Sequence, residues 1–473
     1  MLLKDTKVYA VLEKFDKYEQ NRCRKYIQSP YFNSDENIVD LYNLLIKDIN
    51  KKPKKALQKR MVWKILFPKK AYNDARFRKY VSDLLRLTEG YLAQKFYENN
   101  PVTASYGLIK AVERKKLKIL YKSAIKNARF LSKKYINLSA DYFYQQYKIE
   151  DYYFEVAEFE ANIKQKFNYE EIMYNLDQFY LVEKLRLYCG ILSWKRISTF
   201  DYDVSFIDEV INFVKDNFDK VAPNVEIYYR IHLTYAETDN EENYNILKKL
   251  LNLHSLSFPQ EEAYHLYLQL INYCTKKIRQ GHSAFYNEIF SLYKNMIDNN
   301  LIYEEDMIAP ATFRNIITVS TRLKEFKWAE DFIHQNKNCL PTSQRENLVT
   351  FNLARLYFAQ KKYDKVIELL REVEYSDITL SLQSKSFLLM TYYDIDEYEP
   401  LEFLLESFRV YLNRHKEIPK HRVDYHKNLI KFTKKLTKII PGDKTAVAKI
   451  KQEIETTEGF RVKWLEEKIA ELE

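Results

Sequence analysis

The stretch NLARLYFAQKKYDKVIELL at 352–370 decides the fold, because a second stretch overlays it 35 residues later. The second stretch, FLLMTYYDIDEYEPLEFLL at 387–405, carries aromatic or aliphatic residues at the matching positions. The matched positions are Tyr357 with Tyr392, Tyr363 with Tyr398, Val366 with Leu401, and Leu369-Leu370 with Leu404-Leu405. A period of this length in helical sequence predicts stacked helical hairpins.

The same period extends towards the N-terminus. A backward shift of 37 residues superimposes Phe326, Ala329, Phe332 and Ile333 on Tyr363, Val366, Leu369 and Leu370. A weaker echo consists of Tyr244, Leu247, Leu250 and Leu251. We therefore expect Tyr363 and Tyr398 to occupy equivalent buried positions, and Leu369 and Leu404 likewise.

Within this period, the stretch 352–370 resembles a tetratricopeptide repeat. Its residues stand where that repeat places a leucine, a small residue, two tyrosines and an alanine; they are Leu353, Ala354, Tyr357, Tyr363 and Val366. Valine replaces the usual alanine at 366, and the closing proline is missing. The resemblance implies an array of helical hairpins whose concave surface binds a protein or a peptide, and it implies no catalysis.

Composition predicts an all-α fold along the whole chain of 473 residues. Gly and Pro number only 6 and 11, so sharp turns are scarce, while 46% of the residues are apolar and can fill cores. We predict an α-solenoid of helical hairpins preceded by a basic helical region. The predicted parts are a basic N-terminal region at 1–135, a long-helix connector at 136–222, repeats at 223–408 and capping helices at 409–473.

Motifs for the commonest chemistries are missing from the sequence. No two glycines lie closer than 17 residues, which excludes phosphate-binding loops and the nucleophile elbow. The nearest two cysteines are 65 residues apart, and no HExxH motif occurs. We therefore predict no catalytic residues, no metal site and no cofactor, and we expect a protein that is not an enzyme.

Targeting signals are equally scarce. The chain begins MLLKDTKVYAVLEKF, which meets charged residues at once and lacks the apolar core of a signal peptide. No stretch approaches 18 uncharged apolar residues. The sequence thus predicts a cytoplasmic protein that does not insert into a membrane.

Charge is unevenly distributed along the chain. The formal net charge of +10 conceals a segment at 51–134 with a net charge of +19, whereas 135–408 carries −15. The segment 409–450 is again basic at +9. These charges allow three interpretations: lysines that only keep helix faces soluble, a site for DNA, RNA or an anionic surface, and docking of the basic region onto the acidic one.

Eight basic residues are the candidates for binding a polyanion: Lys69, Lys70, Arg76, Lys79, Arg86, Arg114, Lys115 and Lys116. The sequence predicts a helix at 56–66, a turn at 67–73 and a second helix at 74–96 that is capped by Asn73. Two of the eight residues lie in the turn, and the next three lie on the second helix. These lengths fit a helix-turn-helix, and some bacterial regulators join such a motif to tetratricopeptide-like repeats. However, the sequence after the second helix keeps a helical pattern up to Pro101, whereas a winged helix-turn-helix needs a pair of strands at this point.

The sequence as a whole predicts a non-enzymatic interaction scaffold. Its repeats would bind a protein or peptide partner, and its basic segment 51–134 would attract something anionic. The alternative is a nucleic-acid-binding regulator, in which the basic region binds DNA or RNA and the repeats sense a partner.

Overall fold

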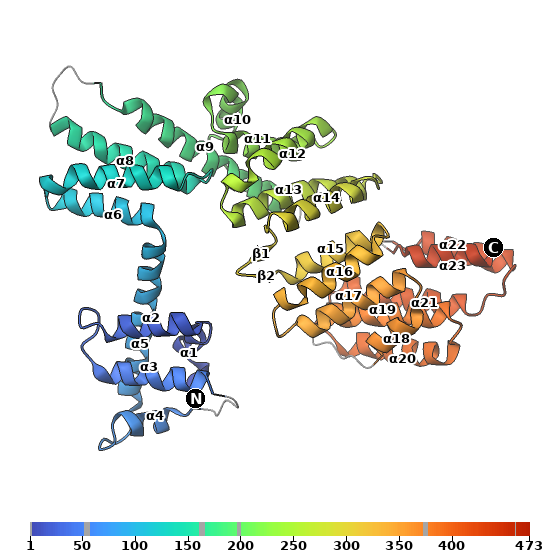
Figure 1. Cartoon of the computed structure of the whole chain (residues 1–473). Coiled ribbons are helices and arrows are strands. Elements are labelled where there is room, and N and C mark those ends of the chain that lie inside the picture. Colours follow the sequence, from blue (N-terminus) through green and yellow to red (C-terminus); the bar gives the residue numbers. More distant parts are fainter. Residues whose placement is uncertain (1, 52–56, 160–165, 196–199, 372–376, 459) are drawn as a thin grey trace. The chain divides into compact units, whose positions relative to one another are not determined.

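The structure, a computed structural model, describes residues 2–51, 57–159, 166–195, 200–371, 377–458 and 460–473. Most of these residues are helical, so the predicted all-α, solenoid-like fold is confirmed (Figure 1). The strands in the described part are one short antiparallel pair, β1 (Tyr303–Glu304) and β2 (Met307–Ile308). No helix among the described residues is both long enough and apolar enough to cross a membrane.

The chain divides into two compact units, unit 1 at Met1–Glu183 and unit 2 at Lys184–Glu473. The helices of unit 1 are α1 (Lys7–Leu12), α2 (Lys17–Gln28), α3 (Glu36–Ile49), α4 (Lys59–Leu66), α5 (Asp74–Asn99), α6 (Pro101–Arg114), α7 (Lys118–Lys134) and α8 (Ala140–Phe159). The helix α9 (Tyr169–Trp194) runs across the boundary between the units.

The helices of unit 2 are α10 (Ile207–Asp216), α11 (Pro223–Ala236), α12 (Glu241–His254), α13 (Gln260–Arg279), α14 (Phe285–Asp298), α15 (Pro310–Arg322), α16 (Phe326–Asn336), α17 (Arg345–Ala359), α18 (Tyr363–Leu370), α19 (Ile378–Asp394), α20 (Tyr398–Arg414), α21 (Lys420–Leu436), α22 (Lys444–Glu455) and α23 (Lys463–Leu472). Short 3-10 helices lie at Leu3–Asp5, Phe218–Lys220, Ser255–Ser257 and Lys337–Cys339.

Unit 1 contains two hydrophobic clusters. One is built from α1 to α5 and includes the fully buried Phe77 and Leu84 of α5. The other joins α6, α7 and α8 around Ile109, Ala128 and Ile149. The helix α5 begins as expected, because the Asn73 side chain accepts a hydrogen bond from the Arg76 amide at 2.9 Å.

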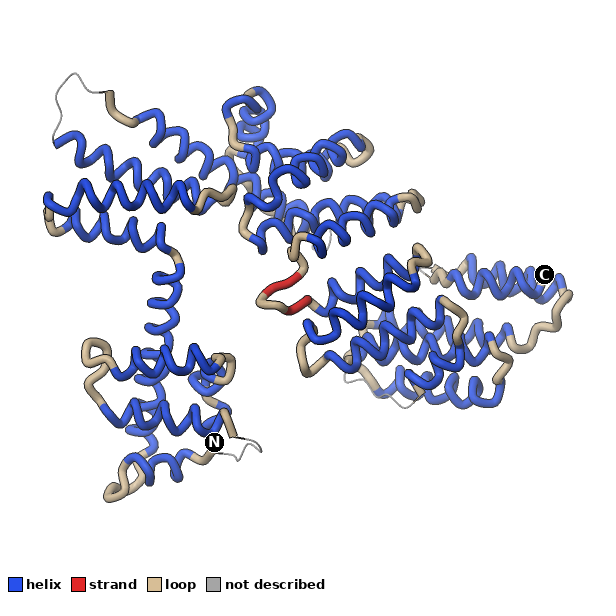
Figure 2. Tube along the Cα trace, viewed as in Figure 1, coloured by secondary structure: helices blue, strands red, loops and turns tan. Residues whose placement is uncertain are grey.

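Unit 2 has the packing pattern of an α-solenoid (Figure 2). Each helix from α11 to α21 packs on the next one in sequence. In addition, α15, α17, α19 and α21 contact one another in succession, which places the first helices of consecutive hairpins side by side. One face of this part of unit 2 is therefore formed by first helices alone.

The hairpins α15–α16, α17–α18 and α19–α20 share one turn geometry. The residue two positions before the second helix has a left-handed backbone at Lys324, Lys361 and Asp396, with φ of 63°, 57° and 60°. In each turn the next amide donates back to a carbonyl five residues earlier; the bond from Lys362 to Tyr357 is 2.9 Å long. This is the Schellman ending of a helix, in which glycine is usual, and here it recurs with the sequence period without glycine.

Because Lys361 holds a conformation that L-residues disfavour, Lys361→Gly is expected to stabilise unit 2 by about 0.5–1 kcal/mol. Urea unfolding monitored by circular dichroism measures the effect. The neighbouring Lys362 has a φ of −90° and gains nothing from glycine, so Lys362→Gly is expected to destabilise the unit. Equal effects of the two substitutions would contradict the assignment of the strain to Lys361.

The alignment of the repeats in the sequence correctly predicted where the second helices begin, but it did not predict which of the matched residues are buried. The helices α16, α18 and α20 begin at the three matched residues Phe326, Tyr363 and Tyr398. The prediction that both tyrosines are buried was wrong. Tyr398 is 46% exposed, and its hydroxyl donates only to Asp396 of its own turn. Leu369 and Leu404 are equivalent but only half-buried. The buried residues are instead their neighbours Leu370 and Leu405.

The C-terminal helices pack against the hairpin of α19 and α20. Helices α21, α22 and α23 pack on one another and share a hydrophobic cluster with α19 and α20. A buried carboxylate adds a polar connection: Asp394, the last residue of α19, accepts hydrogen bonds from Trp464 Nε1 at 3.0 Å and from the Tyr363 hydroxyl at 2.7 Å. Lys468 Nζ lies 3.1 Å from the same carboxylate. The four-part division of the chain at 135, 222 and 408 stays a prediction.

Candidate functional site

All eight basic residues singled out from the sequence are exposed, and all belong to unit 1. Lys69 and Lys70 lie in the turn after α4, and Arg76, Lys79 and Arg86 lie on α5. Arg114, Lys115 and Lys116 lie at the turn between α6 and α7, which belongs to the second hydrophobic cluster. The structure thus distributes the eight residues over two separately packed regions rather than one site.

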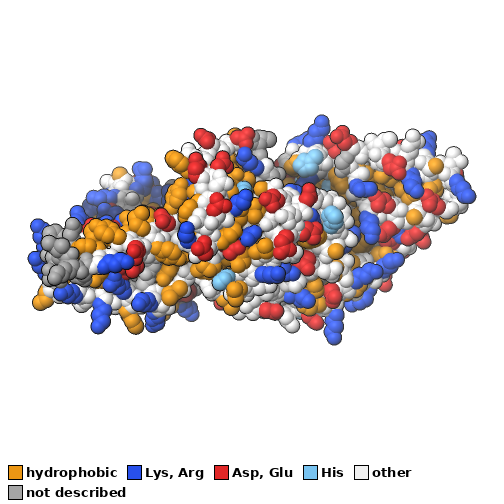
Figure 3. Space-filling view, turned by 90° about the horizontal axis from the view of Figure 1, so that it is seen from above, with side chains coloured by type: hydrophobic (Ala, Val, Ile, Leu, Met, Phe, Trp, Pro, Cys, Tyr) orange, Lys and Arg blue, Asp and Glu red, His pale blue; other side chains and the backbone are white. Residues whose placement is uncertain are grey.

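The basic surface is interrupted by acidic side chains. Asp83 shares the exposed face of α5 and lies 3.5 Å from Arg86, and Asp74 pairs with Arg78 at 2.9 Å. On the face of the molecule shown in Figure 3, acidic and basic side chains are interleaved over most of the surface. The helix α5 is followed directly by the helix α6 and not by a strand pair, so the winged form of a helix-turn-helix is not formed there. Binding of DNA or RNA through 51–134 stays a prediction.

Clusters of metal-binding or redox type do not occur among the described residues. No group of three His, Cys, Asp or Glu side chains there is placed to hold a metal ion. The four cysteines are unpaired; Cys23, Cys189 and Cys274 are buried, and burial raises the pKa of each of these thiols. These thiols pack as small apolar side chains.

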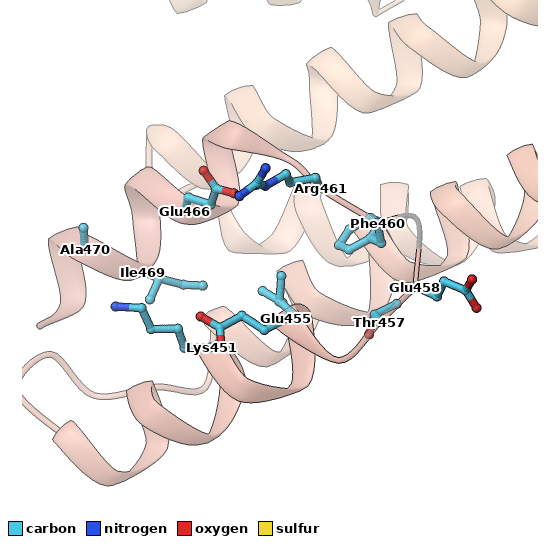
Figure 4. Close-up of a pocket in the computed structure, with 10 residues that line it drawn as sticks. Lys451, Glu455, Thr457, Glu458, Phe460, Arg461, Glu466, Ile469 and Ala470 are labelled. Carbon is cyan, nitrogen blue, oxygen red and sulfur yellow. The ribbon is translucent and has the colours of Figure 1, made fainter. Parts of the chain in front are cut away.

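A cavity of about 800 Å³ lies between α22 and α23 near the C-terminus (Figure 4). Its floor is apolar, with Ile454, Phe460 and Ile469, and its rim carries charges of both signs. Arg461 pairs with Glu466 at 3.4 Å, and Lys451 pairs with Glu473 at 3.1 Å. Because its basic groups are already paired, this cavity offers little to recognise an anionic ligand.

A smaller cavity of about 340 Å³ opens on the face formed by the first helices of the hairpins. Residues of three consecutive first helices line it: Arg355 on α17, Thr379, Gln383 and Ser386 on α19, and Arg422 and His426 on α21. We call this cavity, together with the neighbouring Arg314 and Thr318 of α15, the first-helix groove. Gln383 Oε1 is buried there without a hydrogen-bond partner in the described structure.

The three arginines of the first-helix groove have no carboxylate within ion-pair distance in the described part of the chain. Arg355 donates from Nη1 to the Thr318 hydroxyl and lies 5.2 Å over the Phe351 ring. Arg422 donates from Nη1 to the Thr379 hydroxyl at 3.0 Å. Neutral partners satisfy only part of a guanidinium, which carries five donors. The groove therefore holds positive charge that no carboxylate among the described residues of unit 2 pairs with.

Burial changes the protonation of two groups in the first-helix groove. Burial, and then the nearby Arg314, lower the pKa of Arg355 to about 10. Burial, and then Arg422, lower the pKa of His426 to about 4. His426 Nδ1 lies 3.2 Å from the Ser386 hydroxyl, within hydrogen-bond distance. At neutral pH the histidine is thus uncharged, and the arginines supply the positive charge.

The buried imidazole makes the stability of unit 2 depend on pH. An unfolded histidine takes up its proton near pH 6.5, whereas folded His426 does so only near pH 4, so the unfolded chain binds more protons between these values. The contribution of His426 to the free energy of unfolding of unit 2 is therefore fully present well above pH 6.5. It falls as the pH drops, and about 2 kcal/mol has been lost at pH 5. Urea unfolding at pH 7.5 and pH 5 measures this loss.

His426→Gln is expected to abolish this fall in unfolding free energy between pH 7.5 and pH 5, however much the substitution lowers the stability at neutral pH. His421→Gln changes an exposed histidine on the same helix and is expected to leave the loss intact. An unchanged pH profile in His426→Gln would contradict the role of burial at this position.

Sequence reasoning placed the binding residues in the basic segment 51–134 and missed the first-helix groove. A signal was present: Arg314, Arg355 and Arg422 have only uncharged residues three and four positions away in both directions. Such an arginine cannot form the ion pairs along its own helix that neutralise most surface arginines. The signal became specific only when the structure brought the three helices together.

The comparisons with known proteins give no relative on which a function could rest. No family model matches the chain, and no curated protein or solved structure is significantly similar to it. The site is therefore interpreted from its own geometry.

Proposed function

We propose that the chain is a non-enzymatic scaffold of the cytoplasm, whose hairpins are of tetratricopeptide type and whose first-helix groove binds an acidic segment of a protein partner. The observation that carries the proposal is the set of three arginines that lie in the groove without a carboxylate partner in the described structure. Arg314 and Arg355 are partly buried and Arg422 is exposed. A partly buried cation that lacks a counter-charge costs free energy, and an incoming carboxylate removes that cost. Arginine is suited to this role, because its planar fork binds a carboxylate through two parallel hydrogen bonds.

A protein segment fits the groove better than a small molecule does. The cavity is one part of a face made by the successive helices α15, α17, α19 and α21, and this face is far longer than a small ligand. An extended segment would place one acidic side chain between Arg355 and Arg422. A backbone amide of the same segment would donate to the unpartnered Gln383 Oε1.

Fluorescence anisotropy with a short labelled peptide of glutamate residues tests the proposal on the full chain. We expect salt-sensitive binding, and no binding of the same peptide made of glutamine. Arg355→Gln combined with Arg422→Gln is expected to weaken binding by a factor of about 10 to 100, because each lost charged hydrogen bond is worth about 1.5–3 kcal/mol before compensation.

The matched control combines Arg409→Gln with Arg414→Gln, which removes the same two charges from exposed positions of α20, where Arg409 pairs with Glu406 at 2.7 Å. This variant is expected to bind the glutamate peptide as the wild type does. Equal losses in the control and in the groove variant would reduce the binding to net charge and refute the proposed groove.

A further inference from the structure

The turn that joins α6 to α7 in unit 1 carries an exposed surface that the proposed function does not use. Its seven consecutive residues, Arg114, Lys115, Lys116, Leu117, Lys118, Ile119 and Leu120, are all exposed. We call this segment the α6–α7 tip. The side chain of Ile119 is 90% exposed, which is unusual for an aliphatic residue that follows a helix start.

Buried residues flank the α6–α7 tip on both sides. The preceding Val112 and the following Tyr121, Ala124 and Ile125 are buried in the cluster that joins α6, α7 and α8. Lys116 adopts the left-handed backbone of the Schellman turn, and the Leu117 amide donates to the Val112 carbonyl at 3.0 Å. The buried contacts therefore use the other side of both helices, and they leave the aliphatic side chains of the tip directed away from the core.

The charges of the α6–α7 tip are all positive. No carboxylate of the described residues lies within ion-pair distance of Arg114, Lys115, Lys116 or Lys118. The segment 110–134 contains ten basic residues and one acidic residue, Glu113. On α7 the same exposed face continues with Lys126 and with Phe130, which is also exposed.

We infer that the α6–α7 tip docks on an anionic membrane surface, with Leu117, Ile119 and Leu120 entering the interface and the four basic residues binding lipid headgroups. The mixture of side chains favours lipid over nucleic acid. Aliphatic groups gain free energy when they leave water for the acyl boundary, and lysine and arginine are attracted to anionic headgroups. Single-stranded nucleic acid is bound instead through several aromatic rings that stack on bases; the seven residues of the tip include none, and Phe130 further along the same face is a single ring.

Docking of this kind does not require a helix that spans the bilayer, and it is independent of the first-helix groove in unit 2. It would hold the scaffold at a membrane while the groove engages a partner. Each basic residue near an anionic surface strengthens binding by about fivefold. Burial of an aliphatic side chain adds roughly a further tenfold.

Co-sedimentation of the full chain with vesicles tests the inference. We expect binding to phosphatidylcholine vesicles that contain about 30% phosphatidylserine, and little binding to pure phosphatidylcholine, at about 0.1 M salt. Arg114→Gln, Lys115→Gln and Lys118→Gln together are expected to weaken binding on the order of 100-fold. The control changes Lys69, Arg76 and Lys79 to glutamine; it removes the same charges from the other region of unit 1 and is expected to keep the binding.

A second variant separates lipid from nucleic acid. Ile119→Gln keeps every charge and is expected to weaken vesicle binding about tenfold, while leaving any binding to a single-stranded RNA probe unchanged. Circular dichroism confirms that each variant is folded. Three results would overturn the inference: equal binding to the two kinds of vesicle, an unchanged affinity in Ile119→Gln, or an equal loss in the control with three substitutions.

Discussion

Asp394→Ala is expected to lower the free energy of unfolding of unit 2 by about 3–5 kcal/mol. The Asp394 side chain is only 4% exposed, and it accepts from Trp464 and Tyr363 while pairing with Lys468. Alanine leaves the Trp464 and Tyr363 donors without their acceptor, and it leaves the largely buried Lys468 ammonium with only the exposed Glu471 as a partner. The buried donors and the ammonium keep their desolvation cost. Because Trp464 and Lys468 belong to α23, the C-terminal helix is expected to detach first.

Hydrogen exchange of the α19 and α23 amides measures this loss segment by segment. The matched control is Glu471→Ala, which removes the other carboxylate near Lys468, at 2.8 Å, from an exposed position. Exposed ion pairs contribute about 0–1 kcal/mol, so this variant is expected to remain close to the wild type. A similar cost for both substitutions would show that Asp394 does not organise the contact between α19 and α23.

Leu370→Ala is expected to cost about 2–5 kcal/mol, because it leaves a cavity in the packed hairpin of α17 and α18. Leu370 is 2% exposed and stands at the same repeat position as the buried Ile333 and Leu405. The neighbouring Leu369 is only half-buried, so Leu369→Ala removes fewer contacts and is expected to cost clearly less.

Urea unfolding of the two leucine variants, followed by circular dichroism, compares positions that differ by one residue on the same helix. A larger loss in Leu369→Ala than in Leu370→Ala would mean that α18 is rotated about its axis relative to the structure. The comparison therefore tests the orientation of the second helix of the hairpin, which helix content alone does not report.

Local sequence patterns determined the helices, their starting points and the order of the hairpins. The matched residues Phe326, Tyr363 and Tyr398 mark the first residues of α16, α18 and α20 because each follows the same helix ending. Such an ending depends on a few neighbouring residues, and the apolar period depends on which side of one helix faces its partner. Both kinds of information are present within a single repeat.

Only the tertiary structure decided how deeply each matched residue is buried and which polar groups meet. Tyr363 reaches Asp394 of the next hairpin, whereas Tyr398, at the same repeat position, reaches only its own turn. The first-helix groove joins arginines that lie 41 and 67 residues apart in sequence, at 314, 355 and 422. No helical period relates such positions, because their proximity depends on how successive hairpins stack and on which carboxylates this stacking leaves out of reach.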